Sequence, residues 1–274
     1  MSIVNYYITK NPYFNDGRWI TGSSFKGFFL HSVGVGQPDP MVFIRNWDKP
    51  NYTNAGISGF IGANTTYITA PCLETKGRVK RMPHAGKTAT NNSYIGFEMC
   101  EPGTIRYTGG ASFVVSNLVL AQEYCRKTYA NAVELFAKLC SFHGKNPLTP
   151  GVIYSHNEAG KIGIATTHVD PEHLWKGLKL PYTMDGFRRD VYNKMHESEE
   201  KPMTKSEILT TLGDEYIETF NDLPEWAKPS MREIMDKGFI VGDSASDPND
   251  IGMFLSDIKS IIVSYRMMKG GVEK

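Results

Sequence analysis

The sequence has 274 residues, of which 41% are hydrophobic and 22% charged, and its formal net charge is +1. This length accommodates one large domain and a small one, with the composition of an ordinary globular protein. A charge balance this close to neutral gives no indication of a nucleic-acid partner, and no stretch reaches the roughly 18 apolar residues of a membrane span. The four cysteines form no CxxC pair, which argues against a thiolate zinc site.

Strand and helix patterns alternate through the first 196 residues. Short apolar or alternating runs predict strands at 27–31, 59–62, 66–69, 94–99 and 152–154. Apolar residues spaced three or four apart predict a long helix over 116–139 and a shorter one over 185–194. This order predicts an α/β domain with a central mixed sheet flanked by helices.

A polar, proline-containing stretch at 197–203 reads as a linker between a domain at 1–196 and a second one at 204–274. Helical patterns at 205–212, 225–237 and 251–267 predict that the second domain is small and helical. Residues 204–274 carry 8 Lys and Arg against 13 Asp and Glu, so the front part is mildly basic. That suits an anionic polymer as partner, although two independently solvated surfaces explain the asymmetry equally well.

Four residues have the chemistry of metal ligands. His156, His168 and Asp170 fall within fifteen residues, and His31 ends the apolar run that precedes a glycine-rich loop. Three ligands of the His/His/carboxylate type leave a fourth zinc position open for water, as in hydrolytic zinc sites. The sequence therefore predicts a hydrolase.

Glu98 lies in the predicted strand 94–99, where side chains alternate between two faces. It points away from the apolar residues of that strand, and a buried carboxylate is costly unless a partner or a task accounts for it. A general base acting on an attacking water would be such a task, with burial raising the carboxylate pKa toward a useful range. The alternative is the exposed face of an edge strand.

The remaining histidines divide by their sequence neighbours. His84, in the loop 82–86, is placed where it could contact substrate beside a metal. His143, His173 and His196 are expected to be structural or surface residues, as most histidines are.

Five motifs in order carry a family resemblance over roughly residues 20–195. They are His31 at a strand end, the loop 83–86 with His84, the segment 92–98 with Glu98, His156, and the segment 168–171 with Asp170. This set resembles the zinc-dependent N-acetylmuramoyl-L-alanine amidases of the type 2 amidase and peptidoglycan-recognition fold. The resemblance implies Zn²⁺ held by His31, His156 and Asp170, with Glu98 as the base.

Two departures from the family pattern concern the segment before Asp170. The position two residues earlier is commonly lysine, which stabilises the oxyanion, and here it is His168. A histidine carries a full charge only when protonated, so we expect activity to fall more steeply above neutral pH. The spacer between His156 and Asp170 is also long, which leaves His168 open as the third zinc ligand. In this scheme His84 and Asn92 line the muropeptide groove.

The C-terminal part resembles an S-layer-homology half repeat over about 25 residues, in the segments 219–228 and 235–242. Such repeats attach proteins to secondary cell-wall polymers. A module that only packs, or that forms a homodimer, is the alternative.

Together these features predict a peptidoglycan hydrolase that cleaves the amide between N-acetylmuramic acid and L-alanine. The N-terminal residues lack a signal-peptide pattern, so we expect synthesis in the cytoplasm and action on the wall after release, as in a phage or prophage endolysin or an autolysin. The alternatives are a non-catalytic peptidoglycan-recognition module and a zinc endopeptidase acting on wall peptides.

Overall fold

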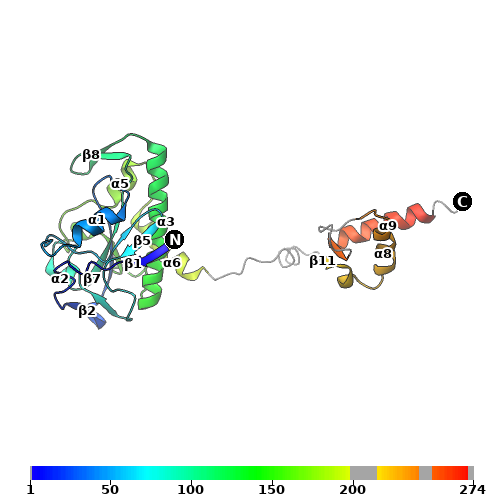
Figure 1. The fold of residues 1–274 in the computed structure, drawn as a ribbon, viewed down its shortest axis with the longest axis horizontal. Coiled ribbons are helices and arrows are strands. Elements are labelled where there is room, and N and C mark those ends of the chain that lie inside the picture. The colour runs from blue at the N-terminus through cyan, green and yellow to red at the C-terminus, as the bar shows by residue number, and fades with distance from the viewer. Residues whose placement is uncertain (1, 198–214, 241–248, 271–274) are drawn as a thin grey trace. The chain divides into compact units, whose positions relative to one another are not determined.

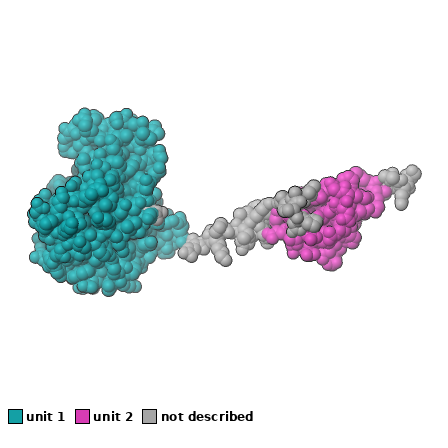
Figure 2. Space-filling model, in the orientation of Figure 1, with its two compact units in different colours: residues 1–197 teal, residues 198–274 magenta. Residues whose placement is uncertain are grey.

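The computed structural model describes residues 2–197, 215–240 and 249–270. The chain divides into two compact units, Met1–Glu197 and Ser198–Lys274, which are coloured separately in Figure 2. Within the described ranges, no helix is both long and apolar enough to cross a membrane.

A six-stranded mixed sheet forms the centre of the first unit (Figure 1). In spatial order its strands are β1 (Ser2–Asn5), β5 (Thr65–Ile68), β4 (Gly59–Ile61), β7 (Tyr94–Met99), β3 (Gly27–Ser32) and β10 (Ile153–Ser155). All neighbouring strands are parallel except β4 and β5, which are antiparallel. The central strands β7 and β3 are almost wholly buried, as is typical of parallel strands that are covered on both faces.

Six α-helices and two small two-stranded sheets complete the described part of this unit. The helices are α1 (Pro40–Trp47), α2 (Thr88–Asn91), α3 (Leu118–His143), α4 (His156–Lys161), α5 (Glu172–Gly177) and α6 (Met184–His196). The small antiparallel sheets pair β2 (Trp19–Thr21) with β6 (Arg78–Lys80) and β8 (Ile105–Gly109) with β9 (Ser112–Val115). A 3-10 turn, η1, spans Gly22–Ser24.

Helix α3, drawn in green in Figure 1, is the longest element and packs against α6. The Asn117 side chain caps its first turn, and Gly144 ends it in the left-handed conformation at φ +66°. Its apolar face joins Ile95, Phe97 and Met99 of β7 in the main hydrophobic core. The residues between them, Gly96 and Glu98, therefore belong to the opposite face of the sheet.

The described part of the second unit combines two α-helices with a two-stranded antiparallel sheet. Its elements are β11 (Tyr216–Thr219), the 3-10 turn η2 (Phe220–Asp222), α8 (Lys228–Asp236), β12 (Asp250–Phe254) and α9 (Leu255–Gly270). Phe220, Leu223 and Ala227 pack in its core, so packing accounts for much of the pattern at 219–228, whereas Trp226 stays about half exposed.

Most of the predicted elements of the first unit are present, shifted by one to four residues at their ends. The strand 94–99 coincides with β7, and the helix expected over 116–139 extends to His143. In the second unit, the helix expected over 251–267 is wrong at its start, because residues 250–254 form β12 and pair with β11. The helix expected at 205–212 lies outside the described residues.

Candidate metal and catalytic site

Strand register brings the candidate ligands together at one end of the sheet. On the parallel strands β3 and β7, His31 pairs with Glu98, and on β10 Ser155 pairs with Leu30. The chain then turns directly into α4, with His156 as its first residue. Ser155 makes this turn sharp, because its side chain accepts from the backbone of Glu158 in a capping box.

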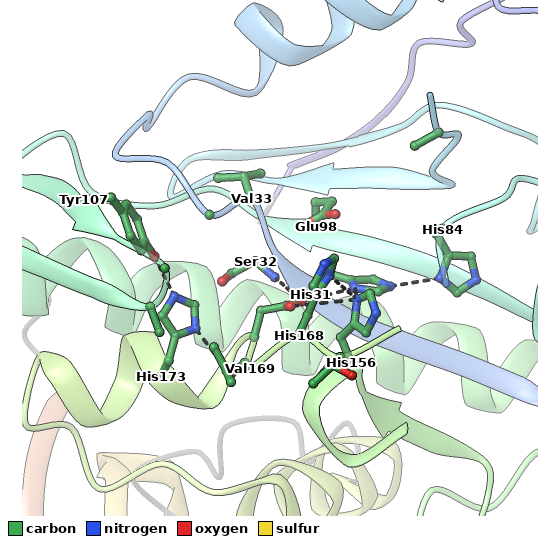
Figure 3. A pocket seen from close by; sticks show the side chains of 16 residues that line it. His31, Ser32, Val33, His84, Glu98, Tyr107, His156, His168, Val169 and His173 are labelled. Atoms are coloured by element: carbon green, nitrogen blue, oxygen red, sulfur yellow. Dashed lines mark hydrogen bonds and ion pairs between the residues drawn. The ribbon is translucent and has the colours of Figure 1, made fainter. Parts of the chain in front are cut away.

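His31, His156 and Asp170 form a buried cluster whose ligand atoms all lie within 4.8 Å of one another. His31 Nδ1 is 3.2 Å from Asp170 Oδ2 and 3.2 Å from His156 Nδ1. The three residues are only 2%, 2% and 9% exposed. Two imidazole nitrogens and one carboxylate oxygen are the donor set of a zinc site with an open position, so these residues fit the metal that the sequence predicts. Figure 3 shows the rings converging.

Each histidine of the cluster has a partner on its outer nitrogen. His31 Nε2 lies 2.9 Å from His84 Nδ1, and His156 Nε2 lies 3.0 Å from Thr166 Oγ1. Both rings therefore turn Nδ1 toward Asp170. Outer contacts of this kind orient the ligands of metal sites.

The electrostatics of the cluster suit a cation. Burial raises the pKa of Asp170, but the hydrogen bond and charge of His31 outweigh it, so the pKa lies below its ordinary value. Burial lowers the pKa of His31, but the hydrogen bond to Asp170 and the charge of Glu98 raise it above its ordinary value. Burial, followed by the charge of His31, lowers the pKa of His156 to about 4. His156 is therefore neutral near pH 7 and its ring can ligate a metal.

Glu98 faces the same space from the central strand β7, not from an edge strand. Its Oε2 atom is buried and has no hydrogen-bond partner among the described residues. Burial raises its pKa to about 8, with the charges of Asp170 and Glu101 adding to the rise and that of His31 opposing it. A carboxyl group that titrates near neutral pH can both take up and release a proton.

His168 lies at the solvent side of the cluster and is exposed. Its Nδ1 is 3.3 Å from His156 Nδ1, and the two rings are 4.3 Å apart. An imidazole in this position can donate a hydrogen bond to a group bound in front of the cluster.

A cavity of about 610 Å³ opens in front of these residues. Tyr107 and His173 form a further part of its wall, and the Tyr107 hydroxyl lies 2.9 Å from Glu101 Oε2 and 2.6 Å from His173 Nε2. His173, expected to be a structural or surface residue, thus lies on the cavity wall, three residues after Asp170 in the sequence.

The two residues expected to line the groove differ in their surroundings. His84 lines the cavity, and the side chain of Asn91 holds its loop by accepting from His84 N and Ala85 N. Asn92 is exposed, and its Oδ1 accepts from Arg81 Nε at 2.7 Å, away from the cavity lining. Sequence reasoning missed Asn91 and Thr166, because neither residue type by itself indicates a supporting role.

The mixed α/β fold and the buried His/His/carboxylate cluster have the features expected of a type 2 amidase, and a family comparison agrees. The family Amidase_2, described as N-acetylmuramoyl-L-alanine amidase, matches residues 26–173, which is more than half of the chain. The chain belongs to this family and is an N-acetylmuramoyl-L-alanine amidase. No curated protein matches the sequence.

Several solved structures are similar to part of this chain. The Staphylococcus aureus hydrolase AmiA in complex with its ligand is 18% identical, with a TM-score of 0.51 over 71% of this chain and 83% of that one. The catalytic domain of XlyA is 19% identical, with a TM-score of 0.46 over 70% and 99%. A mutant endolysin from Bacillus subtilis is 18% identical, with a TM-score of 0.42 over 70% and 99%. At 18% identity, the similarity to AmiA shows a shared fold and no more.

Proposed function

We propose that this amidase depends on zinc held by His31, His156 and Asp170, and that it cleaves the bond between the lactyl group of N-acetylmuramic acid and L-alanine. The observation that carries the proposal is the buried cluster of three ligand atoms within 4.8 Å, at the inner end of a cavity of about 610 Å³. Zinc sites with three protein ligands and an open position are typical of hydrolases.

The chemistry supplied by zinc in such a site is polarisation of a carbonyl group and a lowered pKa of water. Glu98 takes the proton from the attacking water and passes it to the leaving amine as the C–N bond breaks. Its raised pKa supports both steps, since the ideal acid–base group titrates near the working pH. His168 donates a hydrogen bond to the developing oxyanion from the solvent side of the cluster.

Two contrasts favour Asp170 over His168 as the third ligand. Asp170 is buried and lies 3.2 Å from His31 Nδ1, whereas His168 is exposed and contacts His156. The backbone amide of Ser32 also lies 3.4 Å from Asp170 Oδ2 and holds that carboxylate in place.

The proposal includes the role of a phage or prophage endolysin whose second unit attaches to the wall. Support comes from the family membership of residues 26–173, which leaves the second unit outside the amidase domain. The half-exposed Trp226 in the segment similar to S-layer-homology repeats offers an aromatic surface to a polymer.

Product analysis on purified cell walls tests the reaction. The proposed amidase releases N-terminal alanine and creates no new reducing sugar ends. New amino termini from crosslink residues would instead identify a zinc endopeptidase. Walls that bind the zinc-loaded protein without any release would identify a recognition module.

A further inference from the structure

His84 is enclosed between two polar atoms on different strands. Its Nδ1 lies 2.9 Å from His31 Nε2 (Figure 3). Its Nε2 lies 3.1 Å from the carbonyl oxygen of Tyr94. Both ring nitrogens are thus engaged by the protein. A neutral imidazole has one donor and one acceptor nitrogen, so these two contacts use its whole hydrogen-bonding capacity.

The Tyr94 contact decides where the hydrogens lie. A carbonyl oxygen can only accept, so His84 Nε2 carries the hydrogen and His84 Nδ1 is left as an acceptor. His31 Nε2 must then carry a hydrogen to satisfy the 2.9 Å contact between the two rings. In neutral His31 this leaves Nδ1 without a hydrogen and open to a metal, whereas in protonated His31 the same atom donates to Asp170 Oδ2, 3.2 Å away.

The opposite arrangement of hydrogens is unfavourable. If both nitrogens of His84 carried hydrogens, a cation would be buried with no carboxylate among its ring's hydrogen-bond partners. It would also force the hydrogen of a neutral His31 onto Nδ1, which faces the ligand cluster.

Packing holds the His84 ring in this orientation. A Cβ atom on Gly96 would lie 2.7 Å from His84 Nδ1, so the ring lies against the bare backbone of β7. Phe29 packs edge-on against the same ring with centroids 5.1 Å apart, and the rings of His84 and His31 cross at 77°. The ring therefore has little room to turn away from His31.

We infer that His84 is a positioning residue: it accepts the hydrogen bond of His31 Nε2 and so presents His31 Nδ1 to zinc. The inference rests on the proposed zinc site. In this inference His84 acts by orienting the ring of His31, not by contacting the substrate.

Two substitutions at position 84 separate the two hydrogen bonds. In His84→Asn, Oδ1 takes the place of Nδ1 and can accept from His31. In His84→Gln, the terminal amide takes the place of Nε2 and can donate to Tyr94 O, but His31 loses its acceptor. His143→Asn is the matched control, because His143 is also buried and bonded to backbone groups, Gly77 N and Cys72 O, away from the cavity.

Zinc affinity of the full-length protein, measured by competition with a chromogenic chelator, is the first readout. We expect His84→Gln to bind zinc about 10–100-fold more weakly, the usual effect of losing an outer partner of a metal ligand. His84→Asn and His143→Asn should remain close to the unchanged protein. Equal affinities of the Asn and Gln variants would overturn the inference.

The second readout is the position of the ring hydrogens in ¹⁵N-histidine NMR spectra of the unchanged protein. We expect His84 to carry its hydrogen on Nε2 with or without metal, and zinc-loaded His31 to carry its own on Nε2. A hydrogen on His84 Nδ1 contradicts the inference. Should the unchanged protein fail to bind zinc, the proposed function fails, while the metal-free spectrum of His84 still decides where its hydrogen lies.

Discussion

His31 and Glu98 are direct register partners on the adjacent parallel strands β3 and β7. Partners in a sheet project from the same face, so one strand pair supplies both a ligand of the metal cluster and the carboxylate opposite it. The four strands β4, β7, β3 and β10 run parallel, and their buried register fixes this relationship. The site is therefore built on rigid elements on one side and on the loop before α5 on the other.

Replacing Glu98 by Gln should lower the rate of wall hydrolysis about 10²–10⁴-fold, the usual loss when a general base is removed. Zinc content should be unchanged, because Glu98 is not one of the three clustered ligands. Release of N-terminal alanine and bound zinc would be measured together. Glu123→Gln, on the exposed surface of α3, is the control. Full activity of Glu98→Gln would remove this carboxylate from the mechanism.

Asp170→Asn and His168→Ala should both lose activity but should differ in zinc content. Asp170→Asn should lose zinc, because it removes the negatively charged ligand from a buried cluster. His168→Ala should keep zinc and lose activity about 10²–10³-fold, the range for losing one oxyanion donor. Zinc content by atomic emission and alanine release report the two effects. Zinc lost from His168→Ala and retained in Asp170→Asn would assign His168 as the ligand.

Thr166→Val should weaken zinc binding about tenfold, because His156 Nε2 loses its hydroxyl partner at 3.0 Å. Valine keeps the shape of threonine, so the packing against Gly86 is largely preserved. Thr166→Ser retains the hydroxyl and should bind zinc nearly as well as the unchanged protein. If the Val and Ser variants have the same affinity, this hydrogen bond does not orient His156.

Glu101→Gln should stabilise the protein increasingly as the pH rises. Burial raises the pKa of Glu101 from 4.5 to about 7, although Tyr107 and Gly34 donate to it. The folded state therefore holds this proton more tightly than the unfolded state, and stability is lost as the pH rises from about 4.5 to about 7. A difference of about 2.5 pKa units corresponds to a change in the free energy of unfolding on the order of 3 kcal/mol.

Thermal melts of the zinc-loaded variant and unchanged protein at pH 5 and pH 8 measure this effect. The melting-temperature advantage of Glu101→Gln should be larger at pH 8, and comparing the two proteins at each pH removes the pH dependence of zinc binding itself. A melting-temperature advantage that is the same at both pH values, or larger at pH 5, would show that ionisation of Glu101 does not destabilise the protein.

Removing the second unit after Glu197 should leave the hydrolysis of small soluble muropeptides unchanged and weaken sedimentation with intact walls. The expectation follows from the separate hydrophobic core of each unit. Trp226→Ala in the full chain is the matched variant, since the Trp226 side chain is half exposed and its removal spares most of the core. Undiminished sedimentation of the truncated chain would assign wall binding to the first unit.

The sequence could predict the parts of the fold that repeat a simple pattern. Tyr94–Met99 alternates apolar and other residues, and its bounds as a strand were predictable because both faces are specified. The segment 250–254 has the same apolar character as the helix that follows, and only its pairing with β11 makes it a strand. The apolar pattern of so short a segment cannot predict its pairing with a distant strand.

The candidate ligands were predictable for a different reason than their supports. His31, His156 and Asp170 are residue types that bind metals, and the family motifs place them in order. Asn91 accepts from the backbone of His84 and Ala85, and Thr166 contacts His156, so both act through hydrogen bonds that form only in the folded chain. The distance between two residues along the sequence does not reveal such contacts.

Titration of the metal-free protein with zinc, followed by release of N-terminal alanine from purified walls, tests the central claim most directly. Prepared by dialysis against a chelator, the protein should be inactive and then gain activity in proportion to added zinc up to one equivalent per chain. His156→Ala, which lacks one clustered ligand, should not recover at the same zinc concentrations. Full activity of the metal-free protein, or equal recovery of His156→Ala, would contradict the account.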